Sequence, residues 1–200
     1  MIHLPSFVGF ARLFILLCWI AFSVVFFLRR KPAGEIAKRR DSVAMAGIVL
    51  QGAAFFAVWM LQAAMFPAFA PPLLLAQILC VVAAILAVLS DWLVIEAVRI
   101  LGKQWSFQAR LIEGHRLVVA GPYSYMRHPI YTGMLGMLVA TGLAFSVWWA
   151  LALALPIYAA GTAIRVRAEE RLLHDAFGDD FEAYRRYVPA VLPRWKIPRI

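Results

Sequence analysis

The stretch that decides the fold is IYTGMLGMLVATGLAFSVWWALALALPIYAAGTAI, residues 130–164, which contains no Asp, Glu, Lys or Arg. Crossing a bilayer core of about 30 Å takes roughly 20 apolar residues as a helix. We predict two shorter membrane helices here, at 130–145 and 147–164. Because almost no loop joins them, they should form a tight antiparallel hairpin. Pro156 should kink the second helix, unless neighbouring helices satisfy the carbonyl that it frees.

Three longer apolar runs precede this hairpin, at 7–28, 43–66 and 73–97. The first is interrupted only by Arg12, which lies near one end and can reach the interface with its long side chain. The second has no charge, and the third includes Asp91 and Glu96 in its last two turns. The first run is also too long for a signal peptide and lacks a preceding basic segment. We therefore predict one all-α integral membrane domain, residues 1–200, with about five transmembrane helices.

Composition agrees with the membrane class. Of the 200 residues, 64% are hydrophobic and 16% charged, and the mean hydropathy is +0.78. Soluble domains are nearer half apolar and a quarter charged. The net charge of +9 could suggest a nucleic-acid partner, but basic nucleic-acid binders do not contain charge-free apolar runs this long. We attribute the charge to loops beside anionic membrane lipids, and we interpret Cys18 and Cys80, both inside apolar runs, as small hydrophobic residues.

The basic residues fall in alternate loops. The turns after the second and fourth predicted helices carry no charge, whereas the loops after the first and third are rich in Lys and Arg. Because positive loops stay in the cytoplasm, the N-terminus should lie outside and the C-terminus inside. Two polar segments, 99–129 and 165–200, then share the cytoplasmic side and are the candidate catalytic segments.

The connector before the hairpin ends in GPYSYMRHPIYTG, residues 121–133. Pro129 suits the first position of a helix, where its missing N–H costs nothing. Arg127 and His128 would then lie at the positive end of a membrane helix, where outward-pointing backbone donors favour a carboxylate or another anion. Gly133, in the first turn, would let a ligand or another helix come close. An equally simple interpretation is that Arg127 and His128 only anchor the helix among lipid headgroups.

A second charged cluster follows the hairpin and consists of Arg165, Arg167, Glu169, Glu170 and Arg171. Arg165 and Glu169 are four residues apart and share one face of a continuing helix. Such runs usually form solvated, salt-bridged helix ends. Here, however, the hairpin should bring the cluster to the depth of the fourth helix's start, where ionisable groups face a bundle interior or a polar cavity. The helix should end or break at residues 177–178, before a short helix at 180–187.

Several familiar catalytic motifs are absent from the sequence. No G-x-G-x-x-G follows a strand, and no strand–helix alternation exists, which argues against a Rossmann cofactor site. The chain also lacks a P-loop and an H-E-x-x-H motif, and we predict no metal site.

From about Gln108 to Pro193, the sequence resembles the isoprenylcysteine carboxyl methyltransferase family and, more loosely, the phospholipid methyltransferases. The order and spacing of two blocks carry the resemblance, whereas the first three predicted helices match only as generic membrane helices. The first block is Gln108, His115-Arg116-Leu117-Val118, Gly121-Pro122-Tyr123, Arg127-His128-Pro129-Ile130-Tyr131 and Gly133. The second is Arg165, Glu169-Glu170, Leu173, Phe177-Gly178, Tyr184, Val188-Pro189 and Leu192-Pro193.

The resemblance implies S-adenosylmethionine held at the cytoplasmic membrane face without a Rossmann fold. Arg165 falls where the family places an arginine for the substrate, and we expect Arg165 and Glu169 to be catalytic. A carboxylate such as Glu169 suits the cationic or amino end of the cofactor. The cofactor contacts carried over are Gln108, His115, Arg116, Leu117, Val118, Tyr123, His128, Pro129, Ile130, Tyr131, Glu169 and Glu170.

The methyl acceptor is expected to be a lipophilic small molecule or a lipidated substrate that enters sideways from the bilayer. A carboxylate acceptor, as in isoprenylcysteine O-methylation, is already ionised at pH 7, needs no general base and would pair with Arg165. A thiol or amine acceptor would need deprotonation by His115, His128 or a glutamate. We expect a carboxylate acceptor, and the sequence leaves a thiol or an amine open as alternatives.

Two other interpretations compete with a methyltransferase. An NADPH-dependent membrane reductase of the sterol-reductase type shows a similar Gly-Pro-Tyr and Arg-His-Pro-x-Tyr pattern, although such enzymes usually have more membrane spans than this chain offers. A non-catalytic membrane scaffold or lipid-binding protein would use both charged clusters only to fix its topology.

Overall fold

The computed structural model describes residues 6–28, 39–40, 44–62, 65–66, 68, 70–105, 110–111 and 116–193. The predictions for Gln108 and His115 lie outside these residues. Six α-helices account for most of the described chain: α1 (Phe7–Leu28), α2 (Ala44–Met60), α3 (Leu73–Leu101), α4 (Pro129–Phe145), α5 (Trp148–Phe177) and α6 (Asp179–Tyr187).

Short elements complete the connectors between these helices. Two 3-10 turns, η3 (Gly102–Gln104) and η4 (Gly121–Ser124), lie between α3 and α4. Two-residue strands β1 (Arg39–Arg40) and β2 (Arg110–Leu111) pair antiparallel and tie the two basic connectors together. The all-helical prediction is therefore confirmed for the described residues apart from this short ladder and one isolated bridge, between Gln62 and Ser146.

Helices α1, α3 and α5 are long and apolar enough to cross a membrane, and α2 and α4 are shorter apolar helices. The five predicted hydrophobic helices are thus present, whereas five membrane crossings stay a prediction. Helix α2 ends at Met60, earlier than predicted, because the chain then turns to the α4–α5 junction, where Val147 N donates to Leu61 O at 3.2 Å. Helix α3 continues to Leu101, later than predicted.

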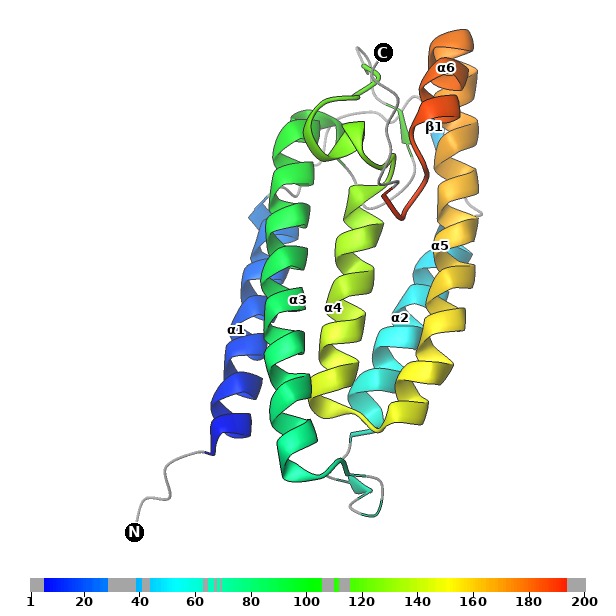
Figure 1. The fold of residues 1–200 in the computed structure, drawn as a ribbon. Helices are drawn as coiled ribbons and strands as arrows, with labels where there is room; N and C mark the ends of the chain where they lie inside the picture. Colours follow the sequence, from blue (N-terminus) through cyan, green and yellow to red (C-terminus); the bar gives the residue numbers. More distant parts are fainter. Residues whose placement is uncertain are drawn as a thin grey trace.

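The helices form a bundle, with β1, the start of α4 and α6 at one end (Figure 1). The most extensive contacts join α2 with α5 and α3 with α4, and both pairs are antiparallel; α1 packs on α3. Only two residues separate α4 from α5, so the tight turn is confirmed, yet each helix packs more closely on another neighbour than on its partner in the hairpin.

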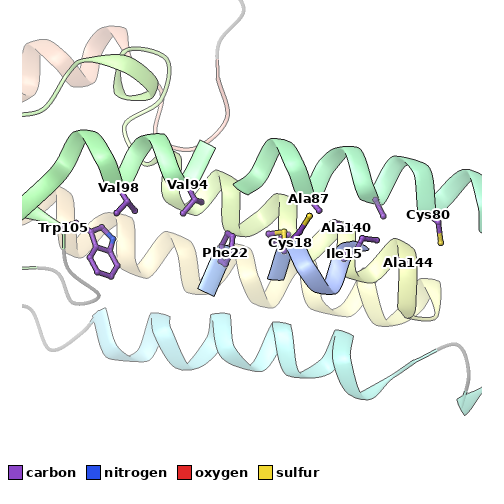
Figure 2. Packing of buried hydrophobic residues seen from close by; sticks show 12 residues of the cluster. Ile15, Cys18, Phe22, Cys80, Ala87, Val94, Val98, Trp105, Ala140 and Ala144 are labelled. Atoms are coloured by element: carbon purple, nitrogen blue, oxygen red, sulfur yellow. The ribbon is translucent and has the colours of Figure 1, made fainter. Parts of the chain in front are cut away.

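The core contains one buried cluster between α1, α3 and α4 (Figure 2) and a second between α2, α4 and α5. In the first, Cys18 and Cys80 are buried free cysteines among aliphatic and aromatic neighbours, in agreement with their interpretation as small hydrophobic residues. The second contains Ala54, Val58, Leu138, Ala154 and Tyr158.

Glycines set the closest helix crossings. A Cβ on Gly133 would meet Val94 and the backbone oxygen of Ser90, so this position brings α3, rather than a ligand, close to α4. Between α2 and α5, a Cβ on Gly47 would lie 2.6 Å from the oxygen of Gly161, and a Cβ on Gly161 would lie 2.8 Å from the oxygen of Gly47. Side chains at either position would force these two helices apart.

Helix α5 continues beyond the predicted membrane segment as a charged extension. It ends at Gly178, whose φ of +49° is readily available to glycine and whose N–H donates to His174 O at 2.8 Å. The amphipathic helix α6 follows and buries Phe181. The predicted break at residues 177–178 and the short helix after it are confirmed.

Candidate active site

The start of α4 carries the first part of the site. His128 is its N-cap residue and Pro129 its first helical residue, as predicted. The N–H groups of Arg127 and His128, however, donate to backbone carbonyls of the tail, the segment that follows α6. The acceptors are the carbonyls of Pro189 and Ala190, each at 2.9 Å. These two backbone donors were expected to face an external anion, but in this structure the protein's own chain occupies them.

The guanidinium of Arg127 connects the tail to α5. Its Nε and Nη2 donate to Oε1 of Glu170 at 2.9 and 2.6 Å, and Nη1 donates to the carbonyls of Arg185 and Val188. The side chains of Arg127 and Glu170 are only 9% and 12% exposed, so the pair is shielded from solvent. Breaking a buried ion pair of this kind is strongly destabilising, because removing one partner leaves the charge of the other buried and unpaired. Arg127 therefore fixes the tail rather than anchoring the helix among headgroups.

His128 lies between the two glutamates. Its Nδ1 is 3.3 Å from Oε2 of Glu169, and its Nε2 is 3.2 Å from Oε1 of Glu170. Burial acts to lower the pKa of His128, but the hydrogen bonds and negative charges of Glu169 and Glu170 outweigh burial and raise it above its ordinary value. Both ring nitrogens are thus engaged, and the imidazolium form is favoured.

Glu169 is the more accessible of the two carboxylates. Its side chain is 26% exposed, compared with 12% for Glu170. Tyr131 Oη donates to its Oε1, and Arg165 Nη2 lies 3.9 Å from the same oxygen. The ring of Tyr131 also stacks on that of His128, with 5.7 Å between the ring centroids. Three side chains from α4 and α5 therefore orient one partly exposed carboxylate.

Arg165 lies deeper in the bundle, where its side chain is 8% exposed. Its Cζ is 4.8 Å from the centroid of the Tyr131 ring, a cation–π contact. Its Nη1 donates to Oε1 of Gln51, on α2, at 3.0 Å. Gln51 was missed by sequence reasoning; the sequence shows it only as a lone amide one turn after Gly47 in α2, a helix without other polar side chains.

The connector before α4 contains the remaining predicted site residues that the structure describes. Arg116 is exposed, its N–H donates to Gln104 Oε1, and Leu117 and Val118 are partly buried. Tyr123 is buried, and its carbonyl accepts a 2.6 Å hydrogen bond from the hydroxyl of Tyr184, on α6. Burial raises the pKa of Tyr123 well above its usual value, so its hydroxyl stays neutral.

The structure therefore brings together five of the predicted site residues: His128, Tyr131, Arg165, Glu169 and Glu170. Tyr123 is connected to α6 through its backbone. Pro129 is buried at the helix start, whereas Ile130 packs against the cluster between α1, α3 and α4, away from the charged groups. The predicted meeting of the two charged clusters is confirmed.

Comparison with known proteins shows the family to which the chain belongs. Residues 78–180 match the family model described as phospholipid methyltransferase, which covers about half of the chain. The chain belongs to this family, which includes the isoprenylcysteine methyltransferases. The match begins within α3, so α1 and α2 lie outside it.

Two relatives illustrate the similarity. The cobalt-zinc-cadmium resistance protein CzcN of Cupriavidus metallidurans is 39% identical over 106 residues, which are 49% of this chain and 45% of that protein. The protein-S-isoprenylcysteine O-methyltransferase of Schizosaccharomyces pombe is 35% identical over 89 residues, 40% of this chain and 34% of that protein. The chain thus covers less than half the length of either relative.

Proposed function

We propose that this protein is an S-adenosylmethionine-dependent methyltransferase that acts at the cytoplasmic face of a membrane on the carboxylate of a lipophilic acceptor. One observation carries the proposal: Glu169 is a partly exposed carboxylate, held by Tyr131, His128 and Arg165 at the basic end of an apolar bundle. Family membership supports methyl transfer as the chemistry.

The residues present fit the proposed cofactor by their chemistry. S-adenosylmethionine, when bound, supplies a methyl group attached to a positively charged sulfur. Glu169 would hold a cationic part of it, and the partly buried Leu117 and Val118 offer apolar surface. Glu170 and Tyr123 are engaged with Arg127 and the Ala97 carbonyl, so we assign them to the wall of the pocket.

The surroundings of His128 favour a carboxylate acceptor. Both of its ring nitrogens face glutamates, so neither is placed to take a proton from a thiol or amine acceptor. A carboxylate needs no such base, because it is already ionised. Arg165, on the bundle side of Glu169, would pair with the acceptor carboxylate. The apolar part of the acceptor would lie in the bilayer.

Ligand binding tests the cofactor. Calorimetric titration of the detergent-purified protein should show binding of S-adenosylmethionine and of its demethylated product, but not of NADPH. Binding of NADPH alone would favour a reductase, and binding of neither nucleotide would favour a scaffold; either result would overturn the proposal.

The acceptor class is tested by the lability of the product. With radiolabelled S-adenosylmethionine and N-acetyl-S-farnesylcysteine as probe acceptor, the label should enter a product that mild base hydrolyses to methanol, as expected for a methyl ester. Label that resists base, as in a thioether or a methylamine, would rule out the carboxylate.

A further inference from the structure

Gln51 is a buried polar residue of α2, and its side-chain amide faces α5. It is 2% exposed; its Oε1 accepts from Arg165 Nη1 at 3.0 Å, and its Nε2 donates to Thr162 Oγ1 at 2.9 Å. A guanidinium offers only donors, so the amide oxygen must face Arg165 and the amide nitrogen must face Thr162. The orientation of Gln51 is thereby fixed by chemistry.

The glycine crossing sets the distance between Gln51 and Arg165. Gly47 and Gln51 are four residues apart and share one face of α2, as do Gly161 and Arg165 on α5. A Cβ on Gly47 would lie 2.5 Å from Cγ of Arg165, and a Cβ on Gly161 would lie 3.0 Å from N of Gln51. The two backbones are therefore close enough for a glutamine to reach the guanidinium.

Arg165 is also held from its other side. The ring of Tyr131, on α4, stands 4.8 Å from its Cζ, and Glu169 Oε1 is 3.9 Å from Nη2. The planar guanidinium thus lies between groups from α2, α4 and α5. Gln51 accepts from Nη1 on the α2 side and so holds the guanidinium plane toward that helix.

We propose that Gln51 is a positioning residue that fixes the guanidinium of Arg165 and, through it, the place of the acceptor carboxylate. This inference rests on the proposed function in assigning the acceptor to Arg165. It gives α2, which lies outside the family match at residues 78–180, a part in the reaction. Gln51 itself touches neither cofactor nor acceptor in this role.

Nuclear magnetic resonance of arginine-labelled protein tests the positioning without any turnover. The guanidinium signals of Arg165 are assigned by their loss in Arg165→Lys. Gln51→Leu should shift and broaden the Nη signals, because rotation about the Cζ–Nη1 bond is released, whereas Gln51→Glu, which keeps an oxygen acceptor, should leave them resolved. Unchanged Arg165 signals in Gln51→Leu would overturn the proposal.

Kinetics test the consequence for the acceptor. With N-acetyl-S-farnesylcysteine, Gln51→Leu should lower kcat/KM by about tenfold or more, the cost of losing a hydrogen bond to a charged group, mainly through a higher acceptor KM. The Kd for S-adenosylmethionine should stay within about twofold of its original value.

The matched control is Val58→Ala, which removes packing from the same helix at a side chain that is 0% exposed. It should lower the melting temperature but spare the acceptor KM. Two results would show that Gln51 contributes only packing. One is a rise in acceptor KM in Val58→Ala as large as that in Gln51→Leu; the other is a loss of cofactor affinity in Gln51→Leu as large as its rise in acceptor KM. If the wild-type protein bound no S-adenosylmethionine, the proposed function would fail, while the resonance experiment would still decide whether Gln51 fixes Arg165.

Discussion

At the residue scale, His128 couples the stability of the site to pH. Two carboxylates face its ring nitrogens, and their hydrogen bonds raise its pKa despite burial of the ring. The pKa in the unfolded chain is about 6.5, so the native state binds the proton more tightly than the unfolded state does. The resulting stabilisation is fully present below the unfolded pKa and is lost as the pH rises through the folded one.

The direction of this pH dependence of stability can be tested with His128→Gln, which keeps hydrogen-bonding capacity but cannot be protonated. The melting temperature of the wild type should exceed that of the variant most at about pH 6, and the difference should shrink toward about pH 9. Scanning calorimetry in one detergent at matched ionic strength measures it. A difference that grows with pH would mean that neutral His128 is the stabilising form.

Glu169 is predicted to contribute directly to cofactor affinity. Replacing it by Gln keeps the shape but removes the charge opposite the cationic ligand, so the Kd for S-adenosylmethionine should rise about tenfold or more. His128→Ala should weaken binding as well, because Glu169 loses an orienting partner. Arg165→Ala should instead spare this Kd and reduce turnover; a collapse of cofactor affinity in that variant would show that the roles are wrongly divided.

Some of these contacts were predictable from sequence and others were not. The Arg-His-Pro-x-Tyr and Glu-Glu motifs, placed at the ends of two helices joined by a tight turn, predicted that the two charged clusters would meet, but not which side chains would pair. Gln51 was not predictable, because a lone amide in an apolar helix has no periodic signal and its partner is 114 positions away. The internal role of Arg127 was also missed, since nothing in its motif shows that tail carbonyls would satisfy it.

At the element scale, hydropathy located the helices but not their ends. The end of α2 depends on a tertiary contact: Gln62 pairs with Ser146, and this pairing interrupts a run that is apolar to Phe66. The end of α5 was predictable, because a glycine such as Gly178 favours the end of a helix through its own backbone conformation, without any tertiary contact.

The α2–α5 crossing gives a prediction of its own. Gly161→Ala places a Cβ 2.8 Å from the oxygen of Gly47, so it should destabilise the protein by about 1–3 kcal/mol despite the better helix propensity of alanine. Gly52→Ala is the matched control, because a Cβ on this exposed α2 residue meets nothing within 4 Å. Thermal unfolding should show a lower melting temperature for the first variant only. Equal stability of both would mean that the crossing can widen freely.

The attachment of α6 and of the tail after it to the rest of the bundle can also be tested. Arg127→Ala removes the donors to Glu170, Arg185 and Val188, so α6 and the following segment should detach. Trypsin should then cleave faster after Arg185 and Arg186, as followed by mass spectrometry. Arg167→Ala, which removes an exposed arginine from α5, should leave the cleavage rate unchanged. Equal protection in Arg127→Ala would show that the packing of Phe181 alone retains the tail.

At the scale of the whole molecule, β1, the start of α4 and α6 lie at one end of the bundle (Figure 1). The asymmetry of Lys and Arg predicts that this end is cytoplasmic. Cysteine labelling in intact cells tests the orientation: Ala70→Cys, in the turn before α3, should react with an impermeant maleimide, and Val119→Cys only after permeabilisation. Both positions are exposed, and the native Cys18 and Cys80 are buried. The reverse pattern would invert the topology.

The overall architecture was predictable in outline, because long apolar runs leave a chain few alternatives to a helical bundle. The pairs of helices that pack together were harder to predict from the sequence. The tight turn between α4 and α5 was predicted, but it does not indicate the main packing partners: α5 packs mainly on α2 and α4 mainly on α3. Small residues at Gly47, Gly133 and Gly161 decide these pairings, and single glycines spread over an apolar sequence do not identify their partners in advance.

The tail also determines the order in which the molecule can be completed. The carbonyls of Pro189 and Ala190 accept from the N–H groups of Arg127 and His128, just before α4, yet they are synthesised after all six helices. A nascent chain with every apolar segment inserted therefore still has unsatisfied donors at Arg127 and His128. Completion of the site is a post-insertion event, and a chain released before residue 188 would keep its membrane helices while lacking the carbonyls that finish the start of α4.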